Sequence, residues 1–435
     1  MKGSIRWLGV MVVAVVVAGC TGVRVPAVRT TMTSSFADSG EVQIGVIEDG
    51  WSIVEATING QGPYRLILDT GSDLSILKPE LLGVIQPQAY TRGELGDIHG
   101  LIATHDVFLA ESIVIEGIEL GDAPLIFTST LDPAFKQIDV DGVLGYRGLD
   151  QYTLDLDGDT DVVRLSTRRL APDEPGVLKM VARDGGTPVV QLSHRLENGR
   201  TLTKRYGLDS GGGFHVSIAG ATLDRFVHTD RARVIGASAA LNTAFRQAQY
   251  APLNGSIRFG GADADWSSVH TLSGVSVSID NEFTLIGNQV LSMFRVQIDP
   301  VSRLVRFSRG DSVGGRIRGR TMYGTGILDA FRIEDRLIIK RIGDQSPAMH
   351  VGLRPGDAVL EIDGEPVDLT NVRDLIGFAS AEPRTLRLLV DRGDSGTGMV
   401  EVGMEAFFAE GLSERGPDLD LPALRLEGGT FIPEP

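Results

Sequence analysis

The sequence contains an internal repeat whose landmarks recur in the same order. The first copy opens with Leu66–Ser72, which has the sequence Leu-Ile-Leu-Asp-Thr-Gly-Ser, and the second with Gly207–Gly212, which has the sequence Gly-Leu-Asp-Ser-Gly-Gly. In each copy a hydrophobic pair and a glycine follow, ending at Gly145 and Gly287, and then a further aspartate and a short closing strand. The separation is 140 residues between the Asp-Thr/Ser-Gly triplets and 142 residues between the two glycines. This order predicts two copies of one lobe, each with an aspartate at a tight glycine turn, and two such aspartates suggest a catalytic pair.

The composition limits the fold classes and the binding partners that can be expected for this chain. The 435 residues include 54 glycines and only 6% aromatic residues, which favours many short strands joined by glycine turns. A formal net charge of −16 without a basic stripe argues against nucleic acid as a partner. The seven histidines show no spacing typical of zinc ligands, so we expect neither a metal nor a cofactor.

The N-terminus resembles the signal of a bacterial lipoprotein. Two basic residues precede an apolar stretch, Leu8–Ala18, that is too short to span a bilayer and ends just before Cys20, the only cysteine. The resemblance implies that a signal peptide, residues 1–19, is removed and that Cys20 then carries lipid, which would anchor the chain without spanning the membrane. The expected location is the cell envelope, at the outer membrane facing the periplasm. The alternative is an ordinary signal peptide with an incidental cysteine. Residues 20–40 are rich in Thr and Ser and predict a flexible tether.

Each copy of the repeat is expected to form one β lobe, with residues 41–170 as the first lobe and 171–313 as the second. In the first lobe, Trp51–Ile58 alternates like a strand, and the Asn-Gly pair that follows is a strong signal for a hairpin turn. The returning strand ends at Asp69. The sequence therefore predicts that a hairpin delivers the aspartate of each lobe.

The residue types around the two aspartates fit a buried catalytic turn. An apolar strand anchors the loop, and glycine permits the sharp turn. Thr70 and Ser210 carry small hydroxyl groups that can hydrogen-bond across to the other lobe, and the Ser72 hydroxyl can donate to the carboxylate. The second copy has Gly212 in the place of Ser72, so Asp209 should lack one hydrogen bond to its charged form. We therefore expect a working pH range that is less acid than that of a stomach-type enzyme.

These motifs resemble those of the pepsin-like and retropepsin-like aspartic proteases, over about residues 41–315. The resemblance implies a two-lobed β fold that binds an extended peptide in a cleft between the lobes. It implies that Asp69 and Asp209 are the catalytic residues. The supporting positions are Thr70, Gly71, Ser72, Ser210, Gly211, Gly145 and Gly287.

Two carboxylates at such a site act as a pair. Like charges about 3 Å apart cannot both ionise easily, so the pair shares one proton. The ionised group acts as a base toward a water between the two, and the protonated group polarises the scissile carbonyl. Because the pair titrates as a unit, no separate role is assigned to Asp69 or to Asp209.

A flap, meaning a hairpin that closes over the site, is expected in each copy. It should lie between the aspartate and the glycine element, which is the hydrophobic pair with its glycine, Gly145 or Gly287. In the first lobe, the glycines of Gly93–Gly100 suit such a hairpin. Closure would cover the substrate and exclude water.

The acidic segment Asp155–Asp161 allows two interpretations. The spacing of its first three aspartates is similar to the start of an EF-hand calcium loop. However, Thr160 stands where that loop needs glycine, and Ser166 where it needs glutamate. We therefore favour a solvated hairpin turn over a calcium site.

A second module follows the lobes. Gly314–Arg320 is short and rich in Gly and Arg and predicts a linker, and a strand is expected at Leu337–Ile342. The stretch Ser346–Val367 resembles a PDZ domain of the bacterial type, which implies a small β barrel with helices over residues 318–408. Asn371–Ala379 would be the helix beside the binding groove.

PDZ domains bind an extended segment as an added strand, and backbone amides often hold its terminal carboxylate. The residues at the position of that carboxylate loop are Gly324, Thr325, Gly326 and Ile327. This sequence differs from the Gly-Leu-Gly-Phe motif that is usual in the carboxylate loop of PDZ domains. The alternative is a module that only packs against the lobes. Residues 409–435 are rich in Pro, Glu and Asp and predict a disordered acidic tail.

The combined expectation is a mostly β protein, with a bilobal aspartic-protease-like fold followed by a PDZ domain. The predicted function is an aspartic endopeptidase that hydrolyses polypeptides, with the PDZ module recruiting or positioning the substrate. The alternative is a catalytically inactive, peptide-binding envelope lipoprotein. The enzyme needs both Asp69 and Asp209, whereas the binding protein needs neither.

Overall fold

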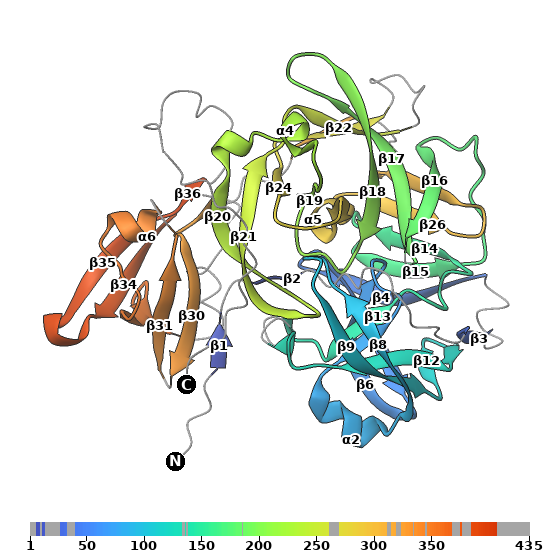
Figure 1. Cartoon of the computed structure of the whole chain (residues 1–435), viewed down its shortest axis with the longest axis horizontal. Helices are drawn as coiled ribbons and strands as arrows, with labels where there is room; N and C mark the ends of the chain where they lie inside the picture. The colour runs from blue at the N-terminus through green and yellow to red at the C-terminus, as the bar shows by residue number, and fades with distance from the viewer. Residues whose placement is uncertain are drawn as a thin grey trace.

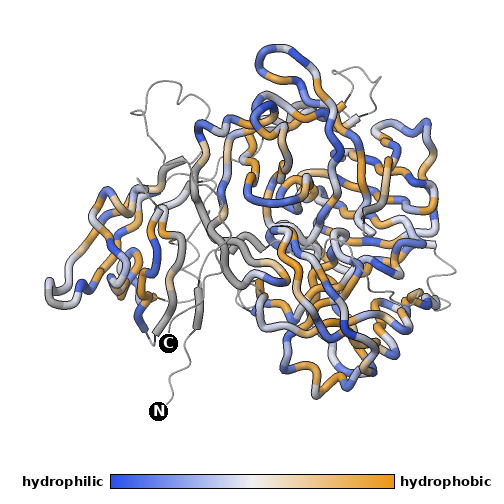
Figure 2. The backbone as a smooth tube through the Cα atoms, viewed as in Figure 1, coloured by the Kyte–Doolittle hydropathy of each residue, from blue (hydrophilic) through white to orange (hydrophobic). Residues whose placement is uncertain are grey.

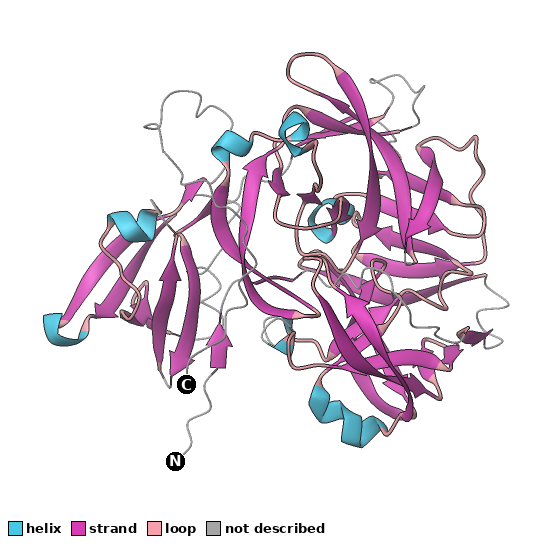
Figure 3. Ribbon diagram, in the orientation of Figure 1, coloured by secondary structure: helices cyan, strands magenta, loops and turns pink. Residues whose placement is uncertain are grey.

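The structure is a computed structural model that describes residues 6–8, 11–13, 27–32, 40–132, 135, 138–184, 186–260, 269–310, 315–318, 323–333, 335–343, 346–367, 375 and 384–406. The fold is mostly β, as Figure 3 shows. Among the described residues, no helix is both long enough and apolar enough to cross a membrane. The predicted fold class is confirmed.

The first lobe lies at the bottom of Figure 1, in blue and teal. Its strands are β4 (Glu41–Glu48), β5 (Trp51–Ile58), β6 (Gln61–Asp69), β7 (Ser75–Leu77), β8 (Gln88–Gly96), β9 (Ile102–Ala110), β10 (Ile113–Ile115), β11 (Ile118–Gly121), β12 (Ala123–Phe127), β13 (Gly142–Gly145), β14 (Thr153–Asp157) and β15 (Val162–Ser166). A short helix, α2 (Leu82–Ile85), follows β7. Strands β5 and β6 turn at Asn59 and Gly60, which both have positive φ angles, 50° and 73°, as the predicted tight hairpin requires.

The second lobe repeats this order and lies at the top of Figure 1, in green and yellow. Its strands are β16 (Val177–Asp184), β17 (Thr187–Arg195), β18 (Thr201–Asp209), β19 (Val216–Ser217), β20 (Arg233–Ala240), β21 (Thr243–Pro252), β22 (Ser256–Phe259), β23 (His270–Ser273), β24 (Ser276–Ser278), β25 (Leu285–Gly287), β26 (Arg295–Asp299) and β27 (Leu304–Ser308). Its helices are α4 (Leu223–Phe226) and α5 (Asn288–Leu291). The pairings repeat as well: β12 is parallel to β7 and antiparallel to β9, and β24 is parallel to β19 and antiparallel to β21. The sequence repeat is therefore a structural repeat.

Parallel pairing brings each glycine element beside its aspartate. Strand β13 pairs with β6 so that Gly145 lies opposite Asp69, and β25 pairs with β18 so that Gly287 lies opposite Asp209. A Cβ atom at Gly145 would lie 2.7 Å from the backbone of Leu74. A Cβ atom at Gly287 would lie 2.1 Å from the backbone oxygen of Phe214. Any larger residue would push the aspartate loop out of position, which explains why both copies keep glycine here.

A six-stranded sheet joins the lobes, in the order β4-β15-β14-β26-β27-β16. Its central pair, β14 and β26, is antiparallel and sets Asp155 directly opposite Gln297. These two positions are 142 residues apart, which is the repeat distance, so the local twofold axis that relates the lobes passes between them. The shared sheet fixes the two aspartate loops relative to each other.

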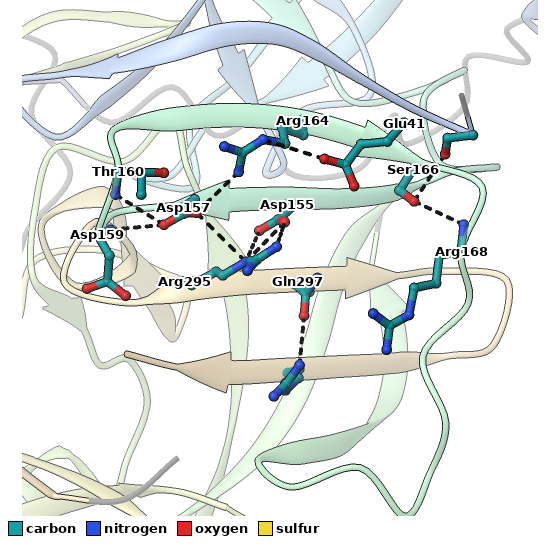
Figure 4. Close-up of polar contacts among 12 residues, drawn as sticks. Glu41, Asp155, Asp157, Asp159, Thr160, Arg164, Ser166, Arg168, Arg295 and Gln297 are labelled. Carbon is teal, nitrogen blue, oxygen red and sulfur yellow. Dashed lines mark hydrogen bonds and ion pairs between the residues drawn. The ribbon is translucent and has the colours of Figure 1, made fainter. Parts of the chain in front are cut away.

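The acidic segment after β14 is held by arginines and backbone amides (Figure 4). The Asp155 carboxylate pairs with Arg295 of the second lobe at distances from 2.5 to 3.1 Å. Asp157 accepts hydrogen bonds from two backbone amides of the turn and pairs with Arg164 at 3.2 Å. Both carboxylates are buried, 3% and 4% exposed. The hairpin turn forms as predicted, and its residues 159–161 are exposed, whereas Asp155 and Asp157 belong to β14 and are covered by the lobe junction. No group of side chains in the described ranges could hold a metal ion.

Apolar side chains fill three cores. The largest spans both lobes and includes Leu154 and Ile298, which pair across the junction. The second lies beneath the β8–β9 hairpin and includes Leu95 and Val107. The third fills the C-terminal domain. Figure 2 shows hydrophobic and hydrophilic residues alternating along the strands, and because successive side chains point to opposite faces, this alternation buries one face of each strand.

The C-terminal domain has its own sheet, in orange and red at the left of Figure 1. The strands of this sheet that come from the domain are β30 (Ile327–Ile333), β31 (Arg336–Ile342), β32 (Ala358–Ile362), β33 (Glu365–Pro366), β34 (Thr385–Asp391) and β35 (Thr397–Gly403). Two further strands, β29 (Tyr323–Gly324) and β36 (Glu405–Ala406), pair with each other in a separate small sheet. Helix α6 (Pro347–His350) begins after Ser346, whose hydroxyl accepts a hydrogen bond from the Met349 amide at 3.3 Å. The predicted groove helix, 371–379, lies outside the described residues except for Leu375, which is buried.

Short segments expected outside the lobes form strands on their edges. Strand β3 (Arg29–Met32), within the predicted tether, pairs with β11, and β28 (Gly315–Arg318), within the predicted linker, pairs with β23. Each segment therefore contains a short strand, because an existing sheet edge can order a segment too short to signal a strand by itself. In the predicted signal peptide, β1 (Arg6–Leu8) pairs with β30 and β2 (Met11–Val13) with β20. Removal of this signal stays a prediction, and Cys20 lies outside the described residues, as do residues 409–435.

Candidate active site

The two aspartate loops are locked together by reciprocal hydrogen bonds. The Thr70 hydroxyl donates to the Leu208 carbonyl at 2.7 Å, and the Ser210 hydroxyl donates to the Leu68 carbonyl at 2.6 Å. Each hydroxyl oxygen also accepts from the backbone amide of the other hydroxyl residue, at 3.0 Å in both cases. As the sequence led us to expect, each hydroxyl reaches across to the other lobe. We call this set of four bonds the interlobe grip.

The carboxylates of Asp69 and Asp209 converge within this grip. The Gly71 amide donates to Asp69 Oδ1 at 2.6 Å, and the Gly211 amide donates to Asp209 Oδ1 at 3.1 Å. A Cβ atom at Gly71 would lie 2.7 Å from one Asp209 oxygen and 3.0 Å from one Asp69 oxygen, so both carboxylates meet at this glycine. Both side chains are 0% exposed, and among the described residues no N–H or hydroxyl group donates to either Oδ2 atom. The two carboxylates are close enough for the charge of Asp69 to raise the pKa of Asp209.

Burial raises the pKa values of both aspartates. Removal from water raises the pKa of Asp69 from 3.8 to about 7, against the opposing effect of the hydrogen bonds that it accepts. Burial also raises the pKa of Asp209 well above its ordinary value, and the nearby charge of Asp69 raises it further. The pair therefore keeps one proton at neutral pH and titrates as a unit.

Ser72 does not bond to the catalytic carboxylate. Its hydroxyl donates to the Leu74 carbonyl at 2.7 Å and accepts from the Leu74 amide at 3.3 Å. The predicted donation to Asp69 was wrong because a serine in a tight turn can satisfy its hydroxyl on the local backbone instead. Ser72 therefore closes the loop that follows the first triplet.

Gly212 leaves space for its neighbours. A Cβ atom there would lie 2.4 Å from Asp209 Oδ2 and 2.7 Å from the ring of Phe214, which is 1% exposed. The glycine thus lets an aromatic ring pack beside the second carboxylate. The raised pKa of Asp209 follows from this burial rather than from the absence of a serine hydroxyl.

A hairpin from each lobe reaches toward the other lobe. The first flap is the predicted hairpin, formed by β8 and β9 with Asp97–Leu101 as its tip. Its counterpart in the second lobe is the β20–β21 hairpin, which Figure 1 shows running toward the first lobe. The Asn242 amide at the tip of the second hairpin donates to Asp97 Oδ2 at 3.1 Å. The sequence predicted a flap in both lobes but gave no location for the second.

Residues 54–147 match the aspartyl protease family. The match to this aspartyl protease domain includes Asp69, the first flap and Gly145. Residues 338–392 match the PDZ domain family. The search of curated proteins found no match to the chain. The second lobe lies outside the matched segment, and its relation to the first rests on the repeated strand pairing.

The predicted carboxylate loop of the PDZ domain is tied internally. The Thr325 hydroxyl donates to the Leu375 carbonyl at 2.6 Å and accepts from the Ile327 amide at 3.2 Å. The Gly326 carbonyl accepts from the Gly343 amide at 2.8 Å, and Gly324 belongs to strand β29. The Ile327 amide is therefore already hydrogen-bonded within the loop.

One contact of the aspartate loops was not anticipated from the sequence. The hydroxyl of Thr187, at the start of β17, donates to the Gly71 carbonyl at 3.3 Å and so ties the second lobe to the first aspartate loop. No motif marks this threonine, since its role depends on where the β16–β17 hairpin lies. The sequence likewise placed Asp97 only within the expected flap and did not indicate its contact with the second lobe.

The raised pKa of Asp69 gives a testable pH dependence of stability. The folded chain binds this proton more tightly than the unfolded chain, so the free energy of unfolding should fall as pH rises from about 4 to about 7. We expect Asp69→Asn to remove part of this fall and to stabilise the protein at about pH 8 by roughly 2 kcal/mol relative to the wild type. Urea unfolding across this pH range measures the difference. Equal pH dependence in the two proteins would contradict the assignment.

Proposed function

We propose that the chain is an aspartic endopeptidase that hydrolyses polypeptides at internal bonds. The observation that carries the proposal is a pair of fully buried carboxylates, Asp69 and Asp209, each anchored by a glycine amide and both meeting at Gly71. Buried like charges that hold one proton between them are the arrangement that acid–base hydrolysis by a carboxylate pair needs. The match of the first lobe to the aspartyl protease family supports the same chemistry.

In the proposed reaction, the ionised carboxylate takes a proton from a water molecule, which attacks the scissile carbonyl carbon. The protonated carboxylate gives its proton to the carbonyl oxygen, so the tetrahedral intermediate is uncharged. Collapse of this intermediate breaks the C–N bond, and a carboxylate returns a proton to the leaving nitrogen. The grip matters because both carboxylates must stay within reach of the same substrate atoms.

The PDZ domain would recruit or position the substrate. Strand addition to a sheet edge is how such domains hold extended segments. In this structure β1 covers the edge of β30, so removal of residues 1–19 would open that edge to a peptide strand. The proposed lipid on Cys20 would hold the enzyme at the outer membrane, facing the periplasm.

The test is cleavage of a diverse peptide pool by the chain that lacks residues 1–20, which retains β3 on the first lobe. We expect cuts between apolar side chains, read by mass spectrometry, with activity that persists well above about pH 4 because burial keeps a proton on the pair. Activity confined below about pH 4 would contradict the pKa argument. Peptides that bind but stay intact would instead favour the alternative, an inactive peptide-binding protein.

A further inference from the structure

Asp97 joins the two hairpins that meet between the lobes, and it is fully buried. Its Oδ1 atom accepts from the amides of His99 and Leu101, both at 3.0 Å, and these bonds shape the tip of the first flap. Its Oδ2 atom accepts from the Asn242 amide at 3.1 Å and from the Thr243 hydroxyl at 3.0 Å. Oδ1 therefore accepts hydrogen bonds within the first flap, and Oδ2 accepts hydrogen bonds from the hairpin of the second lobe.

Asn242 strengthens the same junction through its side chain. Its Nδ2 atom donates to the carbonyls of Leu95 and Leu101, both at 2.8 Å. Its Oδ1 atom lies 2.7 Å from His105 Nε2 on β9. All three partners belong to the first flap or its tip, so Asn242 completes a polar junction between the lobes. We call the contacts of Asp97 with Asn242 and Thr243, together with these side-chain contacts of Asn242, the latch.

An apolar contact accompanies the latch. Leu241, the neighbour of Asn242 in the loop between β20 and β21, is 0% exposed. It packs in a core cluster of the first lobe that includes Leu95 of the flap and Ile67 of the strand that ends at Asp69. Opening the hairpins would return this leucine to water, so its burial favours the closed arrangement.

A third contact holds the flap tip from the other side. The Ile98 carbonyl accepts from the Glu282 amide of the second lobe at 2.9 Å. The tip of the first flap is thus held at Ile98 as well as at Asp97. Both attachments come from the second lobe, and the catalytic carboxylates are 0% exposed while they are made.

We propose that the latch is a gate that must open before a polypeptide can reach Asp69 and Asp209. The inference rests on the proposed function and adds a positioning residue, Asp97, that acts on substrate entry rather than on the chemical step. Two hairpins from different lobes close this gate together. A substrate must therefore separate both tips rather than lift one flap.

The variant Asp97→Asn tests the gate, because its amide keeps the shape of the carboxylate. Its remaining oxygen can still accept from His99 and Leu101, so the tip of the first flap is retained. The new NH₂ group would then face the Asn242 amide, which is also a donor. The latch thus loses the bond between residue 97 and the Asn242 amide, whereas the bonds within the flap stay.

The first readout is hydrogen exchange at the two hairpin tips, which does not depend on catalysis. A hydrogen bond to a buried charged group is worth enough that its loss should speed exchange of the Asn242 amide by about tenfold or more. The matched control is Asp106→Asn, the same change on β9, where the carboxylate is 63% exposed and pairs with Arg92. This control should exchange like the wild type. Unchanged exchange in Asp97→Asn would overturn the proposal.

The second readout is kcat/KM for a quenched peptide that the enzyme cuts. If the gate limits entry, kcat/KM should rise about tenfold in Asp97→Asn and stay unchanged in Asp106→Asn. Faster exchange without a rise in kcat/KM would overturn the gating role. Should Asp97→Asn fail to fold, Asn242→Ala removes the side-chain contacts and must show the same two effects. Exchange measured in an Asp69→Asn background separates failure of the gate from failure of the proposed function, because it needs no cleavage.

Discussion

Replacement of either catalytic aspartate by asparagine is expected to reduce peptide cleavage by at least about a thousandfold. Asparagine keeps the shape of the side chain, but it cannot take up or release the proton that Asp69 and Asp209 share. Because the two carboxylates act as a unit, we expect Asp69→Asn and Asp209→Asn to lose similar activity and the double variant to lose little more.

The measurement is initial-rate cleavage of a quenched peptide at the optimal pH of the wild type. Asp106→Asn serves as the control, since it makes the same chemical change at an exposed carboxylate on the first flap. Full activity in Asp69→Asn or in Asp209→Asn would mean that the carboxylate pair does not perform the hydrolysis. Equal loss in Asp106→Asn would point instead to a general effect of the substitution.

Loss of one hydroxyl from the interlobe grip should destabilise the protein by about 3 kcal/mol. Thr70→Val keeps the size of the side chain but leaves the Leu208 carbonyl and the Ser210 amide without a partner in a buried site. Burying two unpaired backbone groups is costly because they lose water without gaining a replacement.

Thr70→Ser is the matched control, because it keeps the hydroxyl and removes only a methyl group. Urea unfolding of both variants gives the free energies of unfolding, and Thr70→Ser should lie closer to the wild type. A double variant with Ser210→Ala should lose less than the sum of the single losses, since both changes break the same network. Equal stability of Thr70→Val and Thr70→Ser would show that the grip contributes little.

The features that the sequence predicted correctly depend on local patterns or on the repeat. The Asn59-Gly60 turn follows from local residue preferences and occurs where expected. The duplicated lobe and the glycine elements followed from matched spacing, which reports the fold because each landmark has a fixed place in it.

The features that the sequence could not predict depend on contacts between distant segments. Asp155 has the spacing of a calcium ligand, but Arg295 neutralises it across the lobe junction. Ser72 could have donated to a carboxylate or to the backbone, and only the loop geometry decides between them. The contact of Asp97 with Asn242 joins two hairpin tips that no motif connects. In each case the residue type allowed several partners, and the tertiary fold selected one.

The register of the strands β14 and β26 at the lobe junction also determines which lobes can pair with each other. Two copies of the first lobe joined through β14 would set one Asp155 directly against another, because the local twofold axis passes through that position. Like charges directly opposite each other destabilise an antiparallel pair. The first-lobe counterpart of Arg295 is Thr153, so such a pair would also lack the neutralising cation. The charge pattern at the axis therefore disfavours a dimer of two first lobes and favours pairing of the first lobe with the second.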